Sequence, residues 1–359
     1  MHPRVEQLPK PAPDYRRFLQ VLRRERPERV PLIELAVHSE VVNTLLDEPA
    51  ATGAEPRLAL QIANERAVRL HHRLGYDVMK VSAPIPFHVK RLKGEDPSVL
   101  SAGERDWTDE HRGPIGSMAE FDGFRWPTLK DVDFGPVEAA TKVLPDGMKL
   151  IGFSGGVLEF AMDLIGMERL MLATRRDPAL VAAVIERVGQ TIYRVFETYC
   201  QFDSVCALWL GDDLGHKHGT LLSPKWLIEH IVPWYKRFAD LAHAHGRPFL
   251  LHTCGNTAAV MPAIVETGID AKHSFEDGIE PVEQFHDRWA DKIAVLGGVD
   301  VHLLATGDAA TIKARMRQIL EHCAVRGGYA AGSGNSIPNY VPAESYLAMV
   351  EAVAEFNGL

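Results

Sequence analysis

The sequence predicts a (β/α)8 barrel, and three observations lead to that fold class. Short apolar, β-branched stretches recur along the 359 residues, and eight of them have the length of a strand. Segments with the spacing and end signals of helices lie between most of these stretches. Polar side chains follow several of the stretches, as in a barrel, where the active site lies at the carboxyl ends of the strands. A doubly wound sheet is the main alternative, but no G-x-G-x-x-G turn follows an early strand.

The expected strands are spread over the whole chain. Helix signals are clearest between the later ones: the segment after the fourth strand begins with an N-capping Ser223, has Pro224 in its first turn and ends at Gly246. The eight strands are expected at 29–36 (RVPLIELA), 76–83 (YDVMKVSA), 149–155 (KLIGFSG), 204–213 (SVCALWLGDD), 248–254 (PFLLHTC), 270–276 (DAKHSFE), 293–300 (IAVLGGVD) and 328–335 (GYAAGSGN).

The remaining length falls into two segments. Residues 1–28 are expected to form an N-terminal helical extension, and residues 84–148 a long insertion near the barrel mouth. Both would belong to the barrel, so we expect a single domain over residues 1–359.

Composition restricts the class of protein. The chain is 46% hydrophobic and carries a formal net charge of -9, which indicates a soluble globular protein and argues against nucleic acid as a partner. No apolar run approaches the roughly 18 residues of a membrane helix, and the N-terminus lacks the apolar centre of a signal peptide. We therefore expect a cytoplasmic protein with no membrane partner. Four irregularly spaced cysteines do not suggest a disulfide framework.

The strongest candidate for chemistry is LLHTCGNT at 250–257. Alternate residues of a strand share a face, so His252 and Cys254 would project together, close enough to hold one ion. A buried thiol beside a core histidine is the more common explanation of an isolated H-x-C. However, Glu276 ends the next strand, where a carboxylate would complete a His, Cys, Glu zinc set and leave a fourth position open.

Further candidates end other strands. Asp212 and Asp213 close the fourth strand and are the expected catalytic residues, as general base or in substrate binding. Glu34 and His38 close the first strand, where contact with substrate and capping of the following helix are both reasonable roles.

Three more residues are expected to contact substrate. Lys80 would point from the end of the second strand toward the rim or the barrel interior, and a buried lysine would need a carboxylate partner. Asn335 and Tyr340 follow the eighth strand, Tyr340 in a proline-bounded loop that would gate the pocket.

Three stretches of the chain are similar to a known family: RRERPERVPLIEL (23–35), the segment from GDDLGHKHG to HTCGN (211–256) and GGYAAGSGNSIPNYVPAESYLAMVEAV (327–353). They resemble the uroporphyrinogen decarboxylase superfamily, itself a family of (β/α)8 barrels. Within it the chain is more similar to the zinc- and corrinoid-dependent methyltransferase branch. True decarboxylases carry an arginine-rich M-R-Q-A-G-R segment and an F-S-D motif, whereas the corresponding stretches here read IELAVHSE and VSAPI, with Ala83 in place of the aspartate. The porphyrinogen would lack its anchors.

The resemblance also bears on the metal site. The methyltransferase branch uses an H-x-C as zinc ligands, which His252 and Cys254 match, and distantly similar methionine synthases use a glutamate at a position like that of Glu276. Many members supply another cysteine from a G-C-G segment on the eighth strand. This chain reads GSGNSIP there, with Ser333 or Asn335 in its place.

The resemblance implies a zinc-dependent methyltransferase that moves a methyl group between a corrinoid (cobalamin) and a small methylated substrate or thiol, with both directions open. A separate corrinoid protein would be the partner, because no D-x-H-x-x-G corrinoid domain is present. A decarboxylase-like lyase acting on another carboxylated substrate and a non-catalytic tetrapyrrole- or corrinoid-binding protein are the alternatives. The resemblance also makes a homodimer reasonable.

Overall fold

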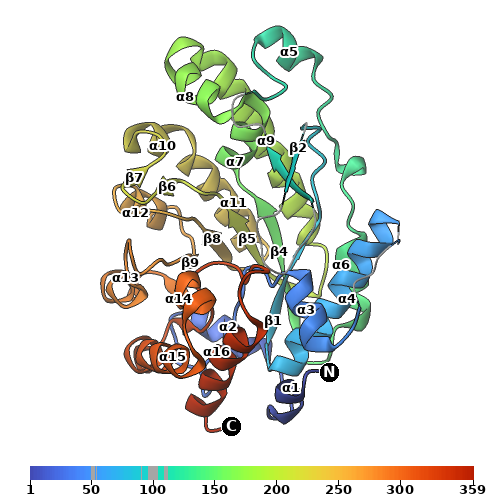
Figure 1. Ribbon diagram of the computed structural model, residues 1–359. Helices are drawn as coiled ribbons and strands as arrows, with labels where there is room; N and C mark the ends of the chain where they lie inside the picture. The colour runs from blue at the N-terminus through green and yellow to red at the C-terminus, as the bar shows by residue number, and fades with distance from the viewer. Residues whose placement is uncertain (50–52, 54, 90, 96–103, 109–111) are drawn as a thin grey trace.

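The barrel sheet is wholly parallel. The computed structural model describes residues 1–49, 53, 55–89, 91–95, 104–108 and 112–359. Seven strands pair in the order β1-β4-β5-β8-β9-β10-β11, each with parallel neighbours (Figure 1). Their bounds are β1 Val78–Ser82, β4 Lys149–Gly155, β5 Val205–Gly211, β8 Phe249–His252, β9 Ala271–His273, β10 Ala294–Leu296 and β11 Tyr329–Ala330.

The first predicted strand lies beside β11. Leu32 pairs with Ala331 and Val37 with Ile337, both in parallel, so residues 31–37 continue the sheet past its last strand. The pairing is limited to isolated bridges, and Pro31 contributes only its carbonyl, which accepts from the Ala331 amide. All eight predicted strands therefore correspond to paired segments, and the predicted barrel fold is confirmed.

Helices surround the sheet and contribute its outer core. The two chain termini lie toward the bottom of Figure 1. The helices are α1 (Pro3–Gln7), α2 (Tyr15–Leu22), α3 (Ser39–Leu46), α4 (Pro56–Leu74), α5 (Met118–Gly123), α6 (Gly135–Val143), α7 (Val157–Ile165), α8 (Met167–Arg176), α9 (Pro178–Tyr199), α10 (Pro224–His230), α11 (Val232–Ala244), α12 (Met261–Val265), α13 (Val282–Trp289), α14 (Val301–Thr306), α15 (Ala309–Cys323) and α16 (Ala343–Phe356), with 3-10 turns η1 (Leu129–Asp131) and η2 (Ala324–Arg326). No helix of the described residues is both long and apolar enough to cross a bilayer.

The barrel interior is closed at one end by the N-terminal extension. Phe18, Val21 and Leu22 of α2 belong to the same buried cluster as the inward side chains of the strands. Small residues line much of that interior, and Trp209 of β5 is its largest fully buried side chain. The Arg17 side chain of α2 binds the buried Asp77 carboxylate with two nitrogens, at 3.0 and 2.7 Å, and so fixes the helix against the start of β1.

The predicted insertion at 84–148 contains local structure of its own. β2 (Arg91–Glu95) and β3 (Glu104–Thr108) form an antiparallel pair outside the barrel sheet, and α5, η1 and α6 follow. Trp126 packs on Phe121 and Phe124, and its ring also contacts Phe87 and the guanidinium of Arg187 on α9. Parts of the predicted insertion, residues 90, 96–103 and 109–111, lie outside the described residues. A second small pair, β6 (Gly215–His216) and β7 (Gly219–Thr220), follows β5.

A candidate metal centre at the barrel mouth

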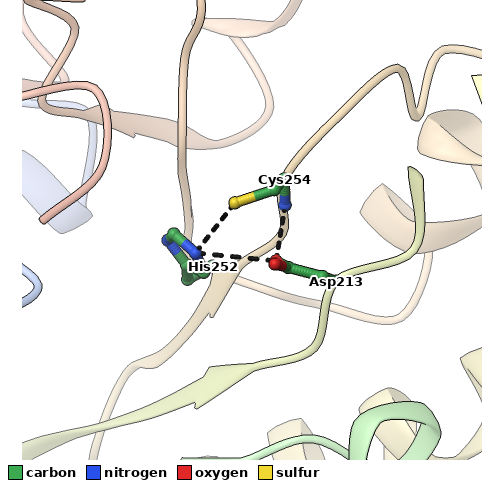
Figure 2. Close-up of side chains that lie close together, drawn as sticks. All are labelled: Asp213, His252 and Cys254. Carbon is green, nitrogen blue, oxygen red and sulfur yellow. Dashed lines mark hydrogen bonds and ion pairs between the residues drawn. The ribbon is translucent and has the colours of Figure 1, made fainter. Parts of the chain in front are cut away.

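Three side chains from the carboxyl ends of β5 and β8 converge. One ligand atom each from Asp213, His252 and Cys254 lies within 4.8 Å of the other two. The Cys254 Sγ is 3.3 Å from His252 Nε2, and Asp213 Oδ1 is 3.6 Å from the same nitrogen (Figure 2). Gly211 and His252 are partners in the sheet register, which places the residues following β5 beside those ending β8.

The backbone around Cys254 is held in position by its neighbours. The Cys254 amide donates to Asp213 Oδ1 at 2.8 Å, so the carboxylate fixes the loop as well as facing the histidine. Gly255 has a φ of +77°, and a Cβ there would lie 2.2 Å from the Gly215 main chain. Only glycine suits this conformation and close approach, which explains the residue that follows the H-x-C.

The His252 imidazole is nearly buried, with 6% of its surface exposed. Burial lowers the pKa of His252 well below its ordinary value, and the neighbouring His273, Lys272 and Lys80 act in the same direction. Its Nδ1 lies 2.7 Å from Nδ1 of His273, while Nε2 faces Cys254 and Asp213. A neutral imidazole with one nitrogen directed at a thiol and a carboxylate is the form that binds metals.

Cys254 receives a hydrogen bond from the eighth strand. The Asn335 side-chain Nδ2 donates to Sγ at 3.2 Å, and Ser274 Oγ lies 3.7 Å from the sulfur. Burial, followed by the Asp213 charge, raises the pKa of the Cys254 thiol to about 12. Asn335 Oδ1 accepts from the Ser336 amide at 2.8 Å, so its nitrogen and not its oxygen faces the sulfur.

The donor set suits zinc. Thiolate, imidazole and carboxylate are its usual protein ligands, and a three-ligand set leaves one position for substrate. With Zn–S about 2.3 Å and Zn–N and Zn–O about 2.0–2.1 Å, a tetrahedral site needs neighbouring ligand atoms roughly 3.3–3.6 Å apart. The measured separations of 3.3 and 3.6 Å from His252 Nε2 to Cys254 Sγ and Asp213 Oδ1 are close to that requirement. A cation there would also favour the thiolate form of Cys254.

The predicted oxygen ligand Glu276 lies outside this group. Its side chain is exposed and lines a small surface hollow with Lys272 and Gly255. The carboxylate within reach of His252 and Cys254 comes instead from Asp213, which the sequence suggested as a catalytic residue. In the sheet, β8 lies between β5 and β9. The oxygen therefore comes from the segment after β5, and not from the segment after β9 where it was predicted.

Asp212, the other predicted catalytic carboxylate, is fully buried. Its two oxygens accept from the amides of Val157, Leu158 and Glu159 at the start of α7, at 3.0–3.2 Å, and from the Tyr235 hydroxyl at 2.9 Å. Burial raises the pKa of Asp212 to about 7, and these hydrogen bonds oppose that rise. The contacts assign Asp212 to capping α7 from another element, with no oxygen left for substrate.

Glu34 is buried, whereas Lys80 on β1 is half-buried. Glu34 is 2% exposed, and its carboxyl group contacts the amide and hydroxyl of Ser333; burial raises the pKa of Glu34 to about 8. Lys80 Nζ lies 4.3 Å from the centroid of the Phe153 ring, and burial lowers the pKa of Lys80 to about 8. Within the described part of the chain, no carboxylate pairs with Lys80, so the expected partner is not found.

His38 and Tyr340 are placed at the surface. His38 Nδ1 accepts from the Glu40 amide at 3.3 Å and caps α3, which is the second of the two roles expected for it. Tyr340 is 51% exposed in the loop between β11 and α16. Neither residue is among the three that converge at the metal centre.

The sequence contained a signal for one residue that it did not single out. His273 ends β9 in register with His252 on β8, so the two imidazoles lie at the same level of adjacent strands. Two histidines at matching positions of neighbouring strand-like stretches would have pointed to this pair. Tyr235, which binds Asp212, lies near the start of α11 and had no comparable signal.

Comparison with known proteins relates this barrel to two kinds of enzyme. The chain is 25% identical to the uroporphyrinogen decarboxylase of Anaeromyxobacter dehalogenans (strain 2CP-C), over 95% of this chain and 99% of that protein. It is 23% identical to a methylated-thiol–coenzyme M methyltransferase of Methanosarcina mazei, over 78% of this chain and 74% of the relative. The solved structure of a methyltransferase from Methanosarcina mazei covers 95% of this chain and 98% of its own, with a TM-score of 0.74 at 16% identity, and supports the fold.

The family is decided by a match over most of the chain. The family description "Uroporphyrinogen decarboxylase (URO-D)" matches residues 113–356, which is more than half of the 359 residues and includes the three residues of the candidate metal centre. The resemblance predicted from the sequence is therefore confirmed at this level, and the chain belongs to the uroporphyrinogen decarboxylase (URO-D) family.

Proposed function

We propose that this protein is a zinc-dependent methyltransferase of a corrinoid system, with zinc held by Asp213, His252 and Cys254. The convergence of these three side chains at the barrel mouth is the observation that carries the proposal. Zinc in such a site lowers the pKa of a bound thiol, or acts as a Lewis acid on a methylated sulfur or oxygen, through its open fourth position. The direction of methyl transfer is left open.

The chain's own residues have distinct tasks in this proposal. Asp213 both binds the metal and holds the Cys254 amide, so it keeps two ligands at a fixed separation. The Asn335 amide donates to the Cys254 sulfur and stabilises its negative charge. Lys80, without a carboxylate partner among the described residues, is proposed to contact substrate from inside the barrel.

The position after β1 supports methyl transfer over haem synthesis. The family resemblance implies that Ala83 takes the position of the aspartate that holds pyrrole nitrogens in true decarboxylases. Ala83 is 4% exposed, and its amide donates to the Tyr199 hydroxyl. An alanine side chain offers no acceptor for pyrrole N–H groups. We propose a separate corrinoid protein as partner, on the support of the similarity to a methyltransferase that acts on methylated thiols.

Elemental analysis after zinc reconstitution tests the metal centre. We expect about one zinc per chain in the wild type and its loss in His252→Ala and Cys254→Ala. Asp213→Asn should weaken zinc binding by more than the roughly 10–100-fold that loss of an outer hydrogen-bond partner costs. Glu276→Gln is the matched control, because that carboxylate lies one strand away and outside the group, and it should bind zinc as the wild type does.

Activity is measured as zinc-dependent methyl transfer between methylcobalamin and a set of small thiols. A wild-type protein that binds no zinc after reconstitution would contradict the proposal, as would a Glu276→Gln variant that loses zinc while Asp213→Asn keeps it. The 25% identity to a decarboxylase over nearly the whole chain favours one second candidate, a metal-independent carboxy-lyase. That candidate predicts unchanged decarboxylation in Cys254→Ala.

A further inference from the structure

A chain of hydrogen bonds connects the metal centre to the main chain that follows β11. His252 Nδ1 lies 2.7 Å from His273 Nδ1, and His273 Nε2 lies 3.1 Å from the Ser333 carbonyl oxygen. His273 is fully buried and His252 is 6% exposed, so water does not compete for these contacts. The chain of contacts ends on the nitrogen of His252 that faces away from Asp213 and Cys254.

The Ser333 carbonyl determines which ring nitrogens of His273 and His252 carry a hydrogen. A carbonyl oxygen only accepts, so His273 Nε2 must carry a hydrogen. The His273 ring is fully buried, and among the described residues no carboxylate forms an ion pair with it, so the ring is neutral and keeps a lone pair on its Nδ1. His252 Nδ1 must therefore donate to that lone pair. A neutral His252 then has its own lone pair on Nε2, directed at the carboxylate and the thiol.

Three other elements hold His273 in this orientation. The Trp209 indole contacts the ring edge-to-face, with centroids 5.4 Å apart. Gly297 follows β10 with a φ of +78°, and a Cβ there would lie 2.1 Å from the Ser333 oxygen and 3.0 Å from the His273 ring. Glu34 accepts from the Ser333 amide at 2.8 Å and so helps to hold the residue that carries this carbonyl. The absence of a side chain at Gly297 lets the imidazole reach that carbonyl.

We infer that His273 is a positioning residue that fixes His252 as the Nδ1–H tautomer, with the Nε2 lone pair presented to the metal before any metal is bound. The role of this tautomer in metal binding rests on the proposed zinc site, but the tautomer itself is a property of the metal-free protein. Without His273, the His252 ring is free to carry its hydrogen on Nε2, and that hydrogen must be displaced before Nε2 can coordinate.

The first test reads the tautomer directly, without metal. Long-range ¹H–¹⁵N NMR spectra of the zinc-free protein, with His252→Gln used to assign its signals, distinguish a ring protonated at Nδ1 from one protonated at Nε2. We expect the Nδ1–H form in the wild type and a shift toward Nε2–H in His273→Phe, which keeps a flat ring beside Trp209 but has no acceptor. A wild-type His252 protonated at Nε2 would overturn the inference.

The second test measures zinc affinity by competition with a chromophoric chelator. His273→Phe should bind zinc about 10–100-fold more weakly. His273→Asn, whose side-chain oxygen lies near the position of Nδ1, should recover most of that loss by accepting from His252. His71→Gln is the matched control, since His71 is also buried and bonded to a main-chain carbonyl, but on the outer helix α4. It should leave the affinity unchanged.

The outcomes separate this inference from the proposed function. A wild type that binds no zinc but shows the Nδ1–H tautomer, lost in His273→Phe, contradicts the metal centre and leaves the positioning role supported. Wild-type zinc affinity in a folded His273→Phe variant, judged by its thermal unfolding curve, overturns the positioning role while the metal centre stands. If the Phe variant does not fold, the zinc-free spectrum of the wild type decides, because a His252 ring protonated at Nε2 overturns the positioning role and one protonated at Nδ1 supports it.

Discussion

Asp212 and Asp213 are adjacent in the chain, yet their carboxylates have different surroundings. Successive side chains at a strand end point to opposite sides, so one carboxylate binds the amides of α7 and the other faces His252. Both were predicted to be catalytic because the sequence indicates that they stand at the end of a strand. It does not indicate that the start of α7 packs against one of them. For the same reason it predicted Glu276 as the oxygen ligand, whereas the structure brings Asp213 to His252 and Cys254.

At the same scale, the Glu34 carboxyl group predicts a pH dependence of stability. Burial raises its pKa to about 8 in the folded protein, above its ordinary value, so the folded state binds this proton more tightly than the unfolded state. The protonated Glu34 carboxyl group makes its full contribution to the free energy of unfolding below about pH 4, and this contribution is lost as the pH rises to about 8. Each unit of difference between the folded and unfolded pKa corresponds to about 1.4 kcal/mol.

Glu34→Gln should remove that loss, because a neutral amide keeps an acceptor for the Ser333 amide and a donor for its hydroxyl. Urea unfolding of both proteins at pH 5 and pH 8 provides the measurement. The wild type should lose more stability than the variant between the two pH values. Equal losses would mean that Glu34 is already ionised in the folded protein at pH 5.

At the scale of elements, apolar periodicity located every barrel strand to within a few residues, but it missed the β2–β3 pair. The stretches RLKGE and ERDWT are mostly polar, so they lack the alternation by which a half-buried strand is recognised. The capping of α7 could not be predicted from the sequence either, because the residue that caps this helix, Asp212, lies more than 50 residues further along the chain. Capping from a distant element leaves no local signal.

That cap leads to a prediction about α7. Asp212→Ala removes the acceptor for three buried amides and the Tyr235 hydroxyl, and should lower the free energy of unfolding by roughly 2–4 kcal/mol. Tyr235→Phe removes only one of these bonds and should cost about 1 kcal/mol. Chemical denaturation of the two variants checks the order. A smaller effect for Asp212→Ala than for Tyr235→Phe would exclude the capping role.

At the scale of the whole molecule, the N-terminal extension was predicted as helical, but its place inside the barrel floor was not. The apolar face of α2 is evident in the sequence, whereas its partners are inward residues of many strands, far apart in the chain. The ion pair that fixes it, Arg17 with Asp77, is likewise separated by 60 residues.

Arg17→Met should therefore destabilise the whole barrel. It leaves the Asp77 carboxylate, 2% exposed, without its cation, and loss of one partner of a buried pair costs about 3–5 kcal/mol. Arg16→Met is the control, because the neighbouring Arg16 makes an exposed pair with Asp14 and should change the unfolding free energy by no more than about 0.5 kcal/mol. Thermal and urea unfolding compare the two; similar behaviour would argue against the role of Arg17.

The pairing of residues 31–37 with the segment after β11 has a consequence for how the protein is made. Glu34 and Ser333 are 299 residues apart, so the barrel cannot close until nearly the entire chain has left the ribosome. Ser333 also holds His273, and Asn335 contacts Cys254, so the surroundings of the candidate metal ligands are completed in that same closing step. We therefore expect nascent chains to bind zinc poorly and the metal to be acquired after synthesis, by the finished barrel.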